Sequence, residues 1–174
     1  MALSIKPYIE NKERIHLIGI GGVSMSALGE LLLSLGVPVS GSDRLKTDVT
    51  ARLESLGAKI TYEHKAENVE GTSLIVRTAA VHDDNPEIVR AHALDIPVME
   101  RAEAWGHLMR DYDNVVCLAG THGKTTSTSM MTLMTIEAGL DPTVMVGSNL
   151  PAIGGTLRIG GKGCFVAESC EYCN

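Results

Sequence analysis

A loop of small and polar residues at positions 120–126 stands between a β-branched run and a helical pattern. A phosphate-binding loop occupies this context, although the strict G-x-x-x-x-G-K-[ST] pattern asks for glycine where the chain has Leu118. Gly123 would let the backbone wrap a phosphate, Lys124 would reach the β and γ phosphates, and Thr125 would offer its hydroxyl to magnesium. The loop therefore predicts binding of ATP and Mg2+, with Lys124 and Thr125 as catalytic groups. The predicted ATP-binding residues are Gly120, Thr121, His122, Gly123, Lys124, Thr125 and Thr126.

A plainer interpretation stays open for this loop, in which Lys124 is only an exposed lysine after a helix-start glycine. His122 either touches substrate or points outwards, and its position in the loop favours neither.

A second glycine-rich segment, residues 19–24, follows an apolar run and precedes another helical pattern. Glycines there let the backbone approach a pyrophosphate and direct amides at it from the helix N-terminus. Ser24 replaces the third glycine of the usual fingerprint, and Asp43 ends the next strand, where an acid commonly meets a ribose or base. The turn by itself is compatible with NAD, with another nucleotide or sugar nucleotide, or with a purely structural tight turn.

Composition excludes several other classes of function. The chain has 174 residues and a formal net charge of −6, and it carries no Lys/Arg cluster, so nucleic-acid binding is not expected. No apolar run reaches the roughly 18 residues needed to span a bilayer, and the first residues lack the apolar stretch of a signal peptide. We therefore expect no membrane association and a cytoplasmic location; the oligomeric state is not indicated.

Four cysteines are present, at positions 117, 164, 170 and 173. Without an export signal, disulfides are not expected. Cys170 and Cys173 have the spacing of half a zinc site or a redox motif, but no second pair completes a zinc site. Ordinary reduced cysteines are the expectation.

Short β-branched runs alternate with longer helical patterns, which predicts an α/β fold with a parallel sheet covered by helices. Gly36 is placed to stop the first long helix, and Asn85 and Pro86 are placed to start a later one. The expected strands are 14–20, 37–42, 58–62, 73–78 and 96–99, and the expected helices are 25–35, 50–56, 85–94 and 101–110.

The polar segment 111–114 predicts a domain boundary, after which the alternation begins again. We expect a Rossmann-like domain over 1–111 and the incomplete start of a P-loop α/β domain over 112–174. Its expected elements are strands 115–119, 144–146 and 164–168, a helix over 124–138, and a loop over 147–163. The chain stops six residues after Glu168, so we expect it to be a fragment of a longer protein.

The glycine turn and the ATP loop, about a hundred residues apart, together resemble the Mur ligase family. Segments 18–26, 40–43, 84–87, 101–103, 140–143 and 166–168 occur in that family's order and spacing, and the match covers nearly the whole chain. The resemblance implies an N-terminal UDP-sugar domain followed by the start of a central ATP-binding domain. The implied UDP-sugar-binding residues are Gly19, Gly21, Gly22, Ser24, Met25, Ser26 and Asp43.

The resemblance also implies a reaction. ATP would activate UDP-N-acetylmuramate as an acyl phosphate, and L-alanine would then form the amide, as a step of peptidoglycan synthesis. Thr125 and Glu168 would hold magnesium; a buried structural role is the plainer alternative for Glu168. After Glu168 the chain departs from the family's acid-rich pattern, although Glu171 keeps one acid.

We expect little or no ligase activity from the chain alone. An isolated sugar-nucleotide-binding module and an NAD-dependent oxidoreductase remain the alternative functions.

Overall fold

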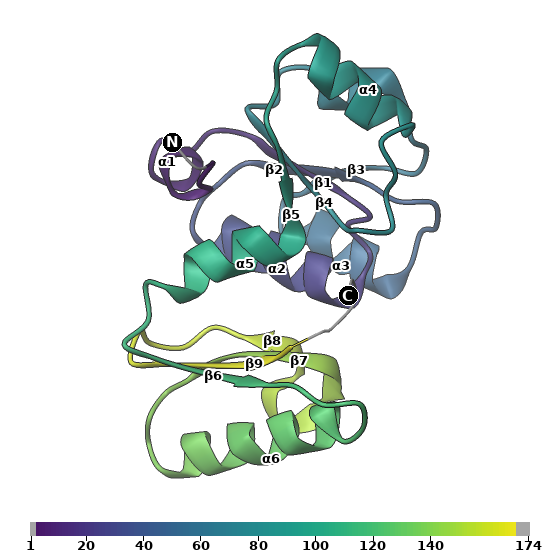
Figure 1. The fold of residues 1–174 in the computed structure, drawn as a ribbon. Coiled ribbons are helices and arrows are strands. Elements are labelled where there is room, and N and C mark those ends of the chain that lie inside the picture. Colours follow the sequence, from purple (N-terminus) through teal and green to yellow (C-terminus); the bar gives the residue numbers. More distant parts are fainter. Residues whose placement is uncertain (1–2, 170–174) are drawn as a thin grey trace. The chain divides into compact units, whose positions relative to one another are not determined.

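The structure is a computed structural model that describes residues 3–169 (Figure 1). It divides into two compact units, Met1–His107 and Leu108–Asn174. This division falls four residues before the boundary expected after Asp111. Across the described residues, no helix has the length and apolar character needed to cross a membrane.

The first unit is built on a five-stranded sheet in which every pair of neighbouring strands is parallel. The strands are β1 (Ile15–Ile18), β2 (Val39–Ser42), β3 (Lys59–Thr61), β4 (Leu74–Arg77) and β5 (Val98–Glu100), in the order β3-β2-β1-β4-β5. The order confirms the expected Rossmann-like α/β class. From β1 the chain adds β2 and β3 on one side and then β4 and β5 on the other, so the topological switch point lies between β1 and β4.

Helices cover both faces of this sheet. They are α1 (Lys6–Glu10), α2 (Val23–Ser34), α3 (Asp48–Ser55), the 3-10 helix η1 (Ala66–Val69), α4 (Pro86–Ala93) and α5 (Arg101–Met109). Figure 1 shows α4 on one face and α2 and α3 on the other. The sequence patterns did not anticipate α1.

Alternation along β1 sends its side chains to the two faces in turn. Ile18 packs with Ile75 of β4 and with Ile88 and Ala91 of α4, and all four are fully buried. Leu17 faces the opposite layer, where a Cβ added at Gly29 of α2 would stand 3.2 Å from its Cδ1 atom. The missing side chain at this helix position therefore lets α2 lie close against the sheet.

Local signals in the sequence set two helix ends as expected. The Asn85 side chain accepts a hydrogen bond of 2.9 Å from the N–H of Glu87, and Pro86 is the first residue of α4. Gly36 follows the C-cap of α2 with φ of +75°, a conformation that side chains disfavour. Cap chemistry therefore fixes where both helices meet their loops.

The second unit contains a four-stranded sheet with the order β6-β9-β7-β8. Its elements are β6 (Asn114–Leu118), α6 (Lys124–Glu137), β7 (Thr143–Leu150), the 3-10 helix η2 (Pro151–Ile153), β8 (Gly155–Arg158) and β9 (Cys164–Glu168). β6, β9 and β7 are parallel, and β8 runs antiparallel to β7. Figure 1 shows α6 along one face of this sheet.

The expectation of a loop over 147–163 was wrong. β7 continues through Leu150, and β8 pairs with it after a turn in which Gly154 has φ of +72°. Leu157 of β8 is 8% exposed, so this short strand contributes to the apolar core. Glycines and small residues hid a hairpin whose strands are stabilised by pairing, because local side-chain preference there is weak.

Candidate functional sites

The glycine turn of the first unit connects β1 to α2. Gly19 has φ of +79°, and its N–H donates to the carbonyl of Ser42 at 2.8 Å. Gly22 is the N-cap of α2, and its N–H donates to the carbonyl of Gly19 at 3.1 Å. Because a glycine cap has no side chain to occupy the first amides of α2, the turn presents a helix N-terminus suited to an anion.

Asp43, at the end of β2, holds this turn in place. One carboxylate oxygen accepts the N–H of Gly21 at 2.7 Å, and the other accepts the N–H of Arg44 at 2.7 Å and of Leu45 at 3.3 Å. A Cβ at Gly21 would stand 2.8 Å from the first oxygen. The aspartate expected near a nucleoside therefore also fixes the glycine turn, and its close approach requires a glycine at position 21.

The three residues expected to bind UDP-sugar from the start of α2 differ in accessibility. Ser24 accepts the indole N–H of Trp105 on its hydroxyl oxygen at 3.1 Å. Met25 is fully buried in the core, and the hydroxyl of the buried Ser26 donates to the carbonyl of Val23 at 2.9 Å. The side chains of Met25 and Ser26 consequently face the protein, and only their backbone belongs to the helix N-terminus.

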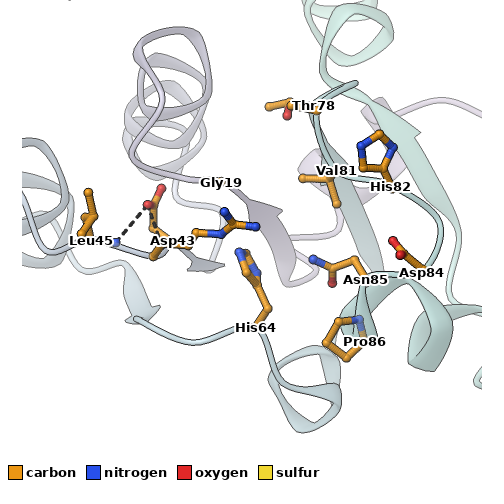
Figure 2. A pocket seen from close by; sticks show the side chains of 12 residues that line it. Gly19, Asp43, Leu45, His64, Thr78, Val81, His82, Asp84, Asn85 and Pro86 are labelled. Carbon is orange, nitrogen blue, oxygen red and sulfur yellow. Dashed lines mark hydrogen bonds between the residues drawn. The ribbon is translucent and has the colours of Figure 1, made fainter.

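A cavity of about 670 Å³ opens beside the glycine turn (Figure 2). It lies at the carboxyl ends of the strands, next to the point between β1 and β4 where the chain reverses across the sheet. Open parallel sheets bind ligands in this position. The lining residues are Gly19, Asp43, Arg44, Leu45, His64, Thr78, Ala80, Val81, His82, Asp84, Asn85 and Pro86.

The cavity lining combines apolar and polar side chains. Val81 and Pro86 offer apolar surface, whereas Arg44, His64 and His82 offer nitrogen atoms. Figure 2 shows Asp43 and Leu45 on one side of the space and Val81, His82 and Asn85 on the other, with His64 between them. An apolar wall with a few polar groups and a helix N-terminus at the edge suits a nucleoside attached to phosphates.

A buried carboxylate, Glu87 in the first turn of α4, lies behind the cavity lining and is 0% exposed. Burial raises the pKa of its carboxyl group, but hydrogen bonds from His16, Asn68, His64 and Ser42 outweigh burial and lower the pKa to about 2. Glu87 is therefore ionised at neutral pH. From the sequence, Glu87 belonged to the segment 84–87 that resembles the Mur ligase family, and no role in the site was predicted for it.

The predicted phosphate loop of the second unit joins β6 to α6. Gly123 has φ of +76° and is the N-cap of α6, so a residue with a side chain would be strained there. The ammonium group of Lys124 donates to the carbonyl of Gly120 at 2.5 Å, across the loop. Thr121, His122 and Thr126 are exposed, and the loop is open to solvent along these residues.

Thr125 and Glu168 meet beside this loop. The hydroxyl of Thr125 donates to one oxygen of Glu168 at 3.1 Å, and the N–H of Gly147 donates to the other at 2.9 Å. Residues 3–169 contain no group of three or more His, Cys, Asp or Glu side chains placed to hold a metal ion. One hydroxyl and one carboxylate nevertheless fit magnesium, which takes few protein ligands and completes its shell with phosphate oxygens and water.

The sequence of this chain matches a known protein family. The family profile described as "Mur ligase family, catalytic domain" matches residues 14–113. The chain belongs to the Mur ligase family. This match covers the sheet, the glycine turn and the cavity of the first unit.

Curated Mur ligase relatives extend the match into the second unit. The UDP-N-acetylmuramate–L-alanine ligase of Acetivibrio thermocellus is 50% identical over 160 residues, covering 92% of this chain and 34% of the relative. The enzyme of the same name from Clostridium novyi is 47% identical over 163 residues, covering 94% of this chain and 36% of the relative. The chain thus spans about a third of the length of these relatives.

Solved structures of the family share the fold. The UDP-N-acetylmuramate-alanine ligase of Thermotoga maritima superposes with a TM-score of 0.83 at 37% identity, covering 90% of this chain and 36% of that one. The UDP-N-acetylmuramate:L-alanyl-gamma-D-glutamyl-meso-diaminopimelate ligase of Neisseria meningitides gives 0.84 at 26% identity, covering 92% and 53%. These Mur ligases therefore combine the same elements in the same order.

Several cavity residues of this Mur ligase chain were not predicted from its sequence. Arg44 directly follows Asp43, His64 follows β3, and the segment 78–86 follows β4. Their place in the cavity could have been predicted from their position in the sequence, because each follows a parallel strand and so lies at the same edge of the sheet. The pair Cys170 and Cys173 lies outside the described residues, whereas Cys117 is an exposed free thiol and Cys164 a buried one.

Proposed function

We propose that this chain supplies the UDP-sugar site and the phosphate loop of an ATP-dependent ligase that joins L-alanine to UDP-N-acetylmuramate. The observation that carries the proposal is the presence of two separate glycine loops, each at a helix N-terminus, of which only the second has a lysine, a threonine and a carboxylate beside it. A dehydrogenase needs one nucleotide site and has no use for the second. The identity of 50% to a relative named for this activity supports the same substrates.

In the proposed reaction, a carboxylate oxygen of the muramoyl group attacks the γ-phosphorus of ATP. The bond from that phosphorus to the β-γ bridging oxygen breaks, giving an acyl phosphate and ADP. The amine of L-alanine then adds to the acyl carbon, the resulting tetrahedral intermediate expels phosphate, and the nitrogen loses a proton as the amide forms. Positioning and neutralisation of phosphate charge provide most of the catalysis in such transfers.

The phosphate loop would divide this work among its residues. Gly120, Thr121, His122, Gly123 and Thr126 would surround the phosphates with backbone and side-chain groups. Lys124 would leave the carbonyl of Gly120 and bind the β and γ phosphates as a point charge. Mg2+ held by Thr125 and Glu168 would supply charge neutralisation at the same phosphates.

The glycine turn would bind the other substrate. Gly19, Gly21, Gly22 and the backbone at the start of α2 would receive the pyrophosphate of UDP-N-acetylmuramate, and the adjacent cavity would receive its nucleoside. Peptidoglycan synthesis in the cytoplasm is the setting that this pair of substrates implies. The predicted domain boundary after Asp111 would separate the two substrate sites.

Equilibrium titration of the full-length protein tests the proposal. UDP-N-acetylmuramate and ATP are expected to bind saturably and at different sites, so that each binds in the presence of the other. NADH is the control ligand, and no saturable binding is expected. Saturable binding of NADH without binding of UDP-N-acetylmuramate would refute the ligase assignment.

A further inference from the structure

Glu87 is the centre of a buried polar cluster that the proposed reaction does not use. One of its carboxylate oxygens, Oε1, lies 3.2 Å from Nε2 of His16 and 2.7 Å from Nδ2 of Asn68. The other, Oε2, lies 2.7 Å from Oγ of Ser42 and 2.7 Å from Nδ1 of His64. Four groups from four different segments thus converge on one carboxylate.

The chemistry of this carboxylate fixes where the protons lie. An ionised carboxylate only accepts hydrogen bonds, so each nitrogen that faces it must carry a proton. His64 therefore holds its proton on Nδ1, and His16 holds one on Nε2. In the neutral His64 ring this leaves Nε2 unprotonated, with a lone pair available as a hydrogen-bond acceptor.

The positions of the two histidines separate their roles. His64 lines the cavity, and Figure 2 shows its ring pointing into that space. His16 is 1% exposed on β1, and its Nδ1 lies 2.9 Å from Oγ of Ser40. His64 is thus the member of the cluster through which Glu87 can affect a ligand in the cavity, because it contacts both.

The set Ser42, His64 and Glu87 has the composition of a hydrolase triad but not its geometry. In a triad the imidazole uses one nitrogen for the nucleophile and the other for the acid. Here Nδ1 of His64 faces both Glu87 and, at 3.1 Å, the hydroxyl of Ser42. Ser42 is also 0% exposed, so it is not a nucleophile.

We propose that Glu87 is a positioning residue for the sugar-nucleotide cavity, which orients the His64 ring so that Nε2 accepts a hydrogen bond from an N–H or O–H group of the bound nucleoside. The inference rests on the proposed UDP-sugar site. It adds to that site a specificity contact with the nucleoside, distinct from the phosphate contacts of the glycine turn.

The ring orientation follows from the number of contacts that would have to break to change it. A ring flip of His64 would remove the proton that Oε2 of Glu87 receives and would place a different ring atom there. Hydrogen bonds to charged groups are stronger than neutral ones, and the Glu87 carboxylate is 0% exposed, so bulk solvent does not reach it to replace a lost donor. The cavity therefore meets a His64 ring that is oriented before the ligand arrives, which lowers the entropy lost on binding.

The first test compares His64→Ala with His16→Gln in the full-length protein, using UDP as the probe. Both substitutions remove one histidine from Glu87, but only His64 lines the cavity. We expect His64→Ala to weaken UDP binding by roughly tenfold to a hundredfold, and His16→Gln to change it by less than about threefold. Equal affinity of His64→Ala and the native protein for UDP would overturn the proposal.

The second test places Glu87→Gln on the native and the His64→Ala backgrounds. A glutamine puts its amide group against two donors whichever way it turns, so the cluster must rearrange. We expect about a tenfold rise in the KM for UDP-N-acetylmuramate in the native background, unchanged KM for ATP, and less than about a twofold effect in the His64→Ala background. The same loss in both backgrounds would show that Glu87 does not act through His64.

Two readouts separate the possible failures. Nitrogen NMR of the ligand-free protein should show the His64 proton on Nδ1, and a proton on Nε2 alone would contradict the proposed orientation. If Glu87→Gln does not fold, the His64 and His16 pair decides the question. Absence of UDP-sugar binding by the native protein would refute the proposed function, whereas native binding with unchanged affinity in His64→Ala would refute this inference alone.

Discussion

Replacing Gly147 by alanine should disable the phosphate loop while leaving the fold intact. An ideal Cβ at this position would stand 2.6 Å from Oε2 of Glu168 and 2.7 Å from both its Cδ and its Oε1. Ordinary contact begins at 3.4 Å, so the carboxylate must move by roughly 1 Å. The Glu168 side chain is flexible at this end, and we expect it to swing away.

The expected cost differs between stability and activity. The substitution removes the hydrogen bond of 2.9 Å from the Gly147 N–H and weakens the one of 3.1 Å from Thr125. Both lie at a partly open surface, so the free energy of unfolding should fall by about 1 kcal/mol or less. A carboxylate misplaced by roughly 1 Å should lower the turnover rate by about tenfold to a hundredfold.

The assay is phosphate release by the full-length protein in the presence of UDP-N-acetylmuramate, L-alanine, ATP and increasing Mg2+. Gly147→Ala should need more Mg2+ and reach a lower maximal rate. Gly155→Ala is the matched control, because a Cβ there meets nothing within 4 Å and it lies in the same sheet. Unchanged turnover of Gly147→Ala at limiting Mg2+ would refute the assigned role of Glu168.

Three further predictions address the other parts of the site. Lys124→Ala should abolish L-alanine-dependent phosphate release while UDP-sugar binding, measured by calorimetry, is retained; unchanged turnover would remove Lys124 from the mechanism. Gly21→Ala should destabilise the fold by about 1–3 kcal/mol and weaken UDP-sugar binding, because the added Cβ would stand 2.8 Å from a carboxylate oxygen of Asp43. Gly106→Ala is the control and should have neither effect, because a Cβ there would meet no atom within 4 Å. Because the pKa of Glu87 falls from 4.5 to about 2 on folding, its ionisation stabilises the fold by about 3 kcal/mol above pH 4.5, and this contribution is lost as the pH falls through 2. Chemical unfolding between pH 7 and pH 3 should therefore show the stability gap between native and Glu87→Gln proteins narrowing with acid, and a gap independent of pH would contradict the ionised state of Glu87.

Local sequence signals predicted much of the fold. Apolar runs marked strands such as β1 because a strand covered on both faces buries the side chains of either face, as the fully buried Ile15, Leu17 and Ile18 show. The buried His16 interrupts this run, and its imidazole is paired with Ser40 and Glu87. Cap residues such as Asn85 and Gly36 marked helix ends because their backbone chemistry is local. β8 was missed because its pairing partner and its one buried leucine, Leu157, stabilise it more than its own sequence does.

The sequence predicted the candidate site only where a short motif fixes the local backbone structure by itself. The two glycine loops could be recognised because each joins a strand directly to a helix. His64 and Glu87 could not be paired from the sequence, since 23 residues separate them and they meet because α4 packs against η1, the short helix that follows His64. The same holds for Gly147 and Glu168, which meet because β7 and β9 are neighbours.

We propose that the two glycine loops serve one acyl-phosphate reaction. It is tested most directly by labelling the muramoyl carboxylate of UDP-N-acetylmuramate with a heavy isotope of oxygen and following turnover with ATP and L-alanine in the full-length protein. Mass spectrometry should find one labelled oxygen in each phosphate released and one phosphate for each amide formed. Unlabelled phosphate, or phosphate release that does not depend on L-alanine, would contradict the account.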